Sequence, residues 1–154
     1  MPEEKPRVLI VEARQHEAVA DALMKGALDA IEAFGAEHDV VIAPGVMEIP
    51  AVVAMAEESG HRAAGVRFDG YVALGAVIGD HSYQFAVLAN ESARTLMDLA
   101  IGRRLAMGYG IVTVDDEDEA MAEARPDLGD RGGAAARACL EMIAIRRRFL
   151  GQPR

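Results

Sequence analysis

The sequence has 154 residues, which is the usual size of one domain and enough to bury a substantial core. Its formal net charge of −9 argues against nucleic acid as a partner, because an acidic surface repels phosphate backbones. No apolar run approaches the length of a membrane span, and Cys139 is the only cysteine, so we expect a cytoplasmic protein without disulfides.

Short apolar runs alternate with segments of helical periodicity along the chain. Nearly continuous apolar runs, typical of fully buried strands, occupy residues 8–11, 40–43, 71–78 and 109–114. Helices are expected at residues 16–34, 48–58, 83–104, 117–124 and 131–149. This alternation predicts a single α/β domain over residues 1–154, with a four-stranded parallel sheet covered by helices on both faces.

Candidate ligand-binding residues follow the ends of the predicted strands, where open α/β sheets bind their ligands. After the second strand, Gly45 allows a ligand to approach the backbone, and Glu48 begins a helix. After the third strand, His81 has the side chain of a proton carrier, and Ser82 precedes helix amides that are able to hold an anion. Arg131 opens the last helix, where its guanidinium suits a phosphate.

Each of these residues also has a purely structural interpretation. Glu48 suits the positive end of a helix dipole, and a lone loop histidine such as His81 is commonly just solvated. The acidic run at 115–119 and Asp130 are interpreted as helix caps, and Cys139 as a small core residue. The sequence has no zinc-ligand spacing, so we expect no metal.

A set of segments in this order resembles a known family across nearly the whole chain. The segments are 8–14 (VLIVEAR), 44–50 (PGVMEIP), 68–78 (FDGYVALGAVI), 89–92 (ANES), 109–113 (YGIVT), 131–133 (RGG) and 140–142 (LEM). They resemble the 6,7-dimethyl-8-ribityllumazine synthases of riboflavin biosynthesis. The resemblance implies a three-layer αβα sandwich with flavodoxin-like topology.

The resemblance also implies an activity and an assembly. Such a transferase condenses 5-amino-6-(ribitylamino)pyrimidinedione with 3,4-dihydroxy-2-butanone 4-phosphate to give 6,7-dimethyl-8-ribityllumazine. The steps are imine formation, phosphate loss and ring closure, without a cofactor or metal. A homo-oligomer is implied, either a pentamer or a decamer, with the active site between neighbouring subunits.

Several site residues carry over from the family to matching positions of this sequence. By the resemblance, backbone groups near Met47, Val77 and Ile78 hold the pyrimidine ring. Glu48 holds ribityl hydroxyls, and Tyr109 closes the pocket from the adjacent subunit. Together with the phosphate loop around residue 82, these positions would form the substrate pocket.

Other site positions depart from the family pattern. Gln15 stands where the family usually has an aromatic ring that stacks on the pyrimidine, and Gly79-Asp80 replaces an arginine-glycine pair at the phosphate loop. Gln84 falls at the catalytic histidine and Ala86 at its carboxylate partner. Arg131 stands where lysine is usual near the phosphate, so positive charge is retained there.

Two main interpretations of the altered pocket remain open, beside a different reaction in the same pocket. In the first, His81 and His16 carry protons in place of the missing histidine, or the enzyme works more slowly by positioning its reactants. In the second, the pocket has lost catalysis, and the protein binds a lumazine or flavin or serves as an assembly scaffold. Turnover of the two substrates separates them.

Overall fold

The computed structural model describes residues 4–79 and 82–151. Its elements in chain order are β1 (Arg7–Ala13), α1 (Glu17–Phe34), β2 (Glu37–Ala43), the 3₁₀ helix η1 (Val46–Glu48), α2 (Ile49–Gly60), β3 (Gly70–Ile78), α3 (Tyr83–Arg103), β4 (Ala106–Val114), α4 (Glu117–Ala124) and α5 (Arg131–Phe149). Every strand and helix expected from the sequence is present, with small shifts of the boundaries. The expected α/β class is therefore confirmed.

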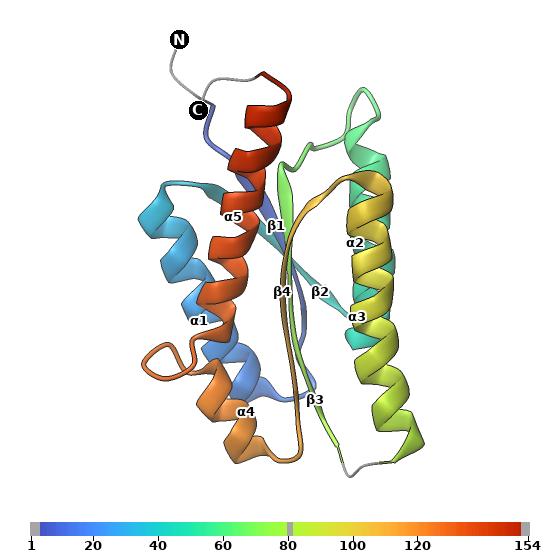
Figure 1. The fold of residues 1–154 in the computed structure, drawn as a ribbon, viewed down its shortest axis with the longest axis vertical. Helices are drawn as coiled ribbons and strands as arrows, with labels where there is room; N and C mark the ends of the chain where they lie inside the picture. The colour runs from blue at the N-terminus through green and yellow to red at the C-terminus, as the bar shows by residue number, and fades with distance from the viewer. Residues whose placement is uncertain (1–3, 80–81, 152–154) are drawn as a thin grey trace.

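The strands form one parallel sheet whose order follows the flavodoxin-like pattern. Over the described residues the sheet has four strands in the order β2-β1-β3-β4, and each neighbouring pair is parallel. Helices α1, α4 and α5 cover one face, and α2 and α3 cover the other (Figure 1). The three-layer αβα sandwich is confirmed. The carboxyl ends of all four strands lie along the same end of the sheet, here called its carboxyl edge.

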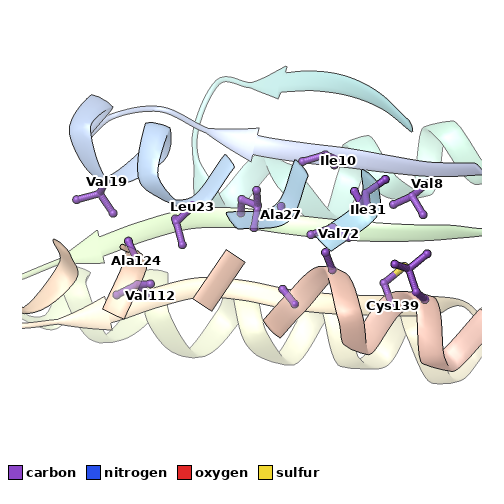
Figure 2. Close-up of a cluster of buried hydrophobic side chains, with 14 of the residues drawn as sticks. Val8, Ile10, Val19, Leu23, Ala27, Ile31, Val72, Val112, Ala124 and Cys139 are labelled. Atoms are coloured by element: carbon purple, nitrogen blue, oxygen red, sulfur yellow. The ribbon is translucent and has the colours of Figure 1, made fainter. Parts of the chain in front are cut away.

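Alternating side chains of the strands build a separate hydrophobic cluster on each face of the sheet. Val8 and Ile10 of β1 join the cluster beneath α1 and α5, whereas Leu9 and Val11 join the one beneath α2 and α3. Figure 2 shows the first cluster, in which Cys139 of α5 lies among the apolar side chains. Cys139 is fully buried, which confirms its prediction as a core residue.

The prediction that the second strand is fully buried is wrong. In β2 only Ala43 is buried, whereas Val40, Val41 and Ile42 are 43, 40 and 63% exposed. The reason is the place of β2 at the edge of the sheet, where it pairs with β1 alone. Helices pack mainly over the inner strands, so the apolar side chains of β2 stay accessible within this chain.

Helix starts follow the expected capping chemistry in one case and not in another. Asp116 Oδ1 accepts a hydrogen bond from Glu119 N at 2.9 Å, so the acidic run does cap α4. Asp130 makes no such capping bond, and that prediction is wrong. Its backbone is left-handed, with φ of 47°, and its carboxylate instead accepts from Arg137 at 3.2 Å.

Candidate active site

The loops at the carboxyl edge of the sheet hold most of the candidate residues. Because parallel strands end at the same edge, the segments after β1, β2, β3 and β4 meet there. Gln15, Glu48 and Ser82 each belong to one of these loops or to the first turn that follows. Arg131 is the first residue of α5, which follows α4 in the chain.

The loops after β1 and β2 are joined by a side-chain hydrogen bond. Gln15 Nε2 donates to the Pro44 carbonyl oxygen at 2.5 Å. A Cβ on Gly45 would lie 2.9 Å from Glu48 Oε2 and 3.2 Å from Gln15 Nε2. Glycine at this position therefore leaves room for a carboxylate and a carboxamide beside bare backbone. Both side chains are exposed, so their polar atoms are accessible to a ligand.

A buried carboxylate precedes this cluster, and sequence reasoning missed its importance. Glu12, in β1, is only 3% exposed, and its Oε1 accepts from Arg14 Nη1 at 2.5 Å. Arg14 also donates to Asp21 of α1. The hydrogen bonds to Glu12 and to Asp21 raise the pKa of the Arg14 guanidinium above its ordinary value. This network fixes the turn that carries Gln15.

The loop after β3 leads into the first turn of α3. Ser82 caps α3, since its Oγ accepts from Phe85 N at 3.2 Å. A Cβ on Gly79 would lie 1.7 Å from the Phe85 ring, so the ring packs directly on this backbone. Gln84 is exposed on the same turn, while His81, expected to carry protons, lies outside the described residues.

The ends of β3 and β2 present backbone beside these side chains. Val77 is 5% exposed and packs in the cluster beneath α2 and α3, and Ile78 is half-buried. Met47, in η1, is 42% exposed. Val77 and Ile78 end β3, where they pair with Thr113 and Val114 of β4.

Arg131 is held by tight packing between α5 and α1. A Cβ on Gly132 would lie 2.0 Å from the Leu23 carbonyl oxygen of α1, so only glycine permits this approach. The side chain of Arg131 is half-exposed, and its Nη2 donates to Glu123 Oε2 of α4 at 3.4 Å. The structure places Arg131 in the α1–α5 layer, and Glu48 follows β2 beside α2 and α3.

Tyr109 lies on β4, within electrostatic reach of Arg131 of its own chain. It belongs to β4 and is 38% exposed, in an apolar groove of ≈ 760 Å³ between α3, β4 and α5. Burial raises the pKa of the Tyr109 phenol, and a hydrogen bond with the buried Ser92 hydroxyl opposes this shift. Glu48, in η1, is not among the residues that line this groove.

Neither a metal cluster nor a membrane-spanning helix was found in residues 4–79 and 82–151. No group of three or more histidine, cysteine, aspartate or glutamate side chains is arranged to hold a metal ion in this part of the chain. Of the helices in these ranges, none combines the length and the apolar character needed to cross a membrane.

Comparison with known proteins agrees with this architecture. The family model for 6,7-dimethyl-8-ribityllumazine synthase matches residues 5–147, a range that includes every loop of the carboxyl edge. The chain is 51% identical to 6,7-dimethyl-8-ribityllumazine synthase 1 of Rhizobium meliloti (strain 1021), covering 92% of each protein. It is 48% identical to the 6,7-dimethyl-8-ribityllumazine synthase of Bartonella tribocorum, covering 94% of this chain and 93% of that protein.

A third relative matches this chain over nearly the whole length of both proteins. The 6,7-dimethyl-8-ribityllumazine synthase of Agrobacterium fabrum is 48% identical and is covered over 99% of its length by 96% of this chain. Identity at this level over nearly full length, together with the family match, confirms the resemblance seen in the sequence. The chain belongs to the 6,7-dimethyl-8-ribityllumazine synthase family.

Proposed function

We propose that the protein catalyses the condensation of 5-amino-6-(ribitylamino)pyrimidinedione with 3,4-dihydroxy-2-butanone 4-phosphate, giving 6,7-dimethyl-8-ribityllumazine for riboflavin biosynthesis. The observation that carries the proposal is the family match over residues 5–147, which spans all the loops of the carboxyl edge. The reaction releases phosphate and water without net oxidation, so it requires no redox cofactor. The buried single cysteine suits the reducing cytoplasm, where we place the enzyme.

The pyrimidine substrate would bind at the ends of β2 and β3. Backbone groups near Met47, Val77 and Ile78 would hold the planar ring. The exposed Glu48 carboxylate would accept hydrogen bonds from ribityl hydroxyls, and the bare Gly45 backbone beside it supports this role. A carboxamide replaces the stacking ring usual in the family, and loss of such stacking costs about 0.5–1.5 kcal/mol.

The phosphate of the second substrate would bind near the start of α3 and to Arg131. Ser82 caps α3, and the first-turn amides of a helix favour an anion. The guanidinium of Arg131 supplies positive charge and is half-exposed, so a phosphate reaches it without disturbing the core.

Proton transfer is the part of the reaction for which the described residues provide least. Gln84 replaces the usual histidine on the first turn of α3, and Ala86 replaces its carboxylate partner. A carboxamide orients a substrate by hydrogen bonding but carries no proton at neutral pH. We assign Gln84 to orientation and proton transfer to His81, with His16 at the start of α1 as a second donor. The chemistry depends largely on positioning two reactive partners, which itself supplies much of the rate.

The active site requires a neighbouring copy of the chain. Tyr109 of β4 lines the groove between α3, β4 and α5, and Glu48 of η1 is not among the residues that line it, so a pocket shared by the two would take Glu48 from a neighbouring copy. Exposed apolar side chains lie at both places: Ile42 of β2 is 63% exposed, and the groove beside Tyr109 includes Met97 and Ile101 of α3, which are 60 and 70% exposed. Contact between two different surfaces of the same chain generates a ring when its rotation closes, and we propose a pentamer or a pair of pentamers.

Incubation of the purified protein with both substrates tests the proposal. We expect lumazine fluorescence to appear at a rate above that of the uncatalysed mixture. Glu48→Gln should raise KM for the pyrimidine substrate, whereas Glu58→Gln, an exposed change at the far end of α2, should not. No turnover together with tight binding of lumazine or flavin would instead establish a non-catalytic binder.

A further inference from the structure

The arginine proposed to hold the substrate phosphate is already paired with a carboxylate of its own chain. Arg131 Nη2 lies 3.4 Å from Glu123 Oε2, and the two side chains are 50 and 39% exposed. Arg131 begins α5 and Glu123 lies near the end of α4. The pair therefore bridges two helices on the solvent side of the molecule.

The surroundings of this pair are acidic. A hollow of ≈ 670 Å³ on the β4–α4 side has Asp115, Glu119 and Glu123 in its lining, and none of its described lining residues is basic. Glu119 Oε2 accepts from Asp115 N at 3.1 Å, which keeps these two residues in place at the start of α4. A phosphate that approaches Arg131 thus meets negative charge on the side that α4 occupies.

We infer that Glu123 determines the phosphate affinity of the site by competing with the phosphate for Arg131. The inference rests on the proposed function, in which Arg131 binds the phosphate of the second substrate. Because a carboxylate neutralises the guanidinium at rest, a phosphate binds only by displacing Glu123 or by sharing Arg131 with it. An exposed ion pair is weak enough to be displaced, so Glu123 weakens phosphate binding without abolishing it.

Removal of the Glu123 charge should tighten phosphate binding. Inorganic phosphate, titrated into the intact oligomer and followed by calorimetry or nuclear magnetic resonance, is the probe. Glu123→Gln should lower the phosphate Kd roughly two- to fivefold, the range that an exposed ion pair supports. The gain should shrink at high salt, because exposed charges are screened there.

Two further variants separate this inference from a general charge effect. Glu58→Gln removes an equal charge from a comparable exposed pair, in which Arg62 lies 3.2 Å from Glu58, and it should leave the phosphate Kd unchanged. Adding Arg131→Gln to Glu123→Gln should remove the gain. Circular dichroism and the melting temperature verify that each variant is folded.

Each result decides the question. A tighter Kd in Glu123→Gln that depends on Arg131 supports the inference. An unchanged Kd, an equal change in Glu58→Gln, a gain that survives loss of Arg131, or no phosphate binding in any variant overturns it. The phosphate Kd is measured separately from lumazine formation. A protein that shows the expected Kd changes but forms no lumazine would therefore contradict the proposed activity and not the inference.

Discussion

Substitution of Gly132 by alanine should destabilise the fold at the contact between α1 and α5. An ideal Cβ at this position lies 2.0 Å from the Leu23 carbonyl oxygen and 2.7 Å from its carbonyl carbon. Real Cβ contacts below 3.0 Å are essentially never seen, and the opposing atoms here belong to the α1 backbone rather than to a flexible side chain. The two helices must therefore separate by roughly an ångström, the difference between the 2.0 Å contact with the Leu23 oxygen and the 3.0 Å limit.

The loss of folding stability in Gly132→Ala follows from the contacts that this separation loosens. Ala136, Leu140 and Ile143 of α5 are buried in the cluster that α1 also lines, and a shift of α5 loosens all of these contacts. Inserting a methyl group into a packed contact costs about 1–3 kcal/mol. The higher helix propensity of alanine offsets about 1 kcal/mol of this, so we expect a net loss of about 0–2 kcal/mol, and of about 1–3 kcal/mol relative to an alanine substitution without the clash.

Urea unfolding at a fixed protein concentration measures the effect, because any oligomer links stability to concentration. The matched control is Gly102→Ala in α3, where no atom lies within 4 Å of the added Cβ. That variant should be neutral or more stable by up to about 1 kcal/mol. If Gly132→Ala is as stable as Gly102→Ala, the packing argument is refuted.

Four further outcomes are expected. Gln84→His combined with Ala86→Asp should raise lumazine turnover, by about 10²–10⁴-fold if a missing proton carrier limits the rate; unchanged turnover would show that it does not. Burial raises the pKa of the Cys139 thiol to about 12, so the native protein should resist thiol reagents at pH 8. Above about pH 9 the thiol of the unfolded chain loses its proton while the buried thiol keeps its own, so the free energy of unfolding should fall as pH rises from about 9 toward 12. Unfolding curves of Cys139→Ala should show a smaller fall. Tyr71→Phe removes a hydrogen bond of 2.8 Å from the buried phenol to Glu57 and should cost about 1 kcal/mol in urea unfolding, whereas Tyr71→Phe with wild-type stability would contradict that role.

Local patterns predicted the elements because they depend on near neighbours in the chain. Continuous apolar runs identified the strands, and the acidic residues before α4 correctly predicted its cap, with Asp116 bonded to Glu119. Burial of β2 was predicted wrongly from the same kind of pattern. An apolar run has the same pattern in a central strand and in an edge strand, so the pattern does not predict how exposed the strand is.

In the candidate site, too, the sequence predicted the positions of residues but not their contacts with distant segments. The positions of Gln15, Glu48 and Ser82 after strand ends follow from the order of the elements. The bond from Gln15 to the Pro44 carbonyl and the pairing of Arg131 with Glu123 join different loops and helices. Neither contact has a local signal, because each depends on how the elements pack.

By itself, the sequence determined the alternation of strands and helices, the parallel sheet, and the family, since these are written in periodicity and in ordered segments. Tertiary structure alone decided that β2 and β4 are the opposite edges of the sheet. It also decided that Glu123 faces Arg131. Strand order and helix packing arise from contacts between residues distant in the chain, which no short stretch of sequence contains.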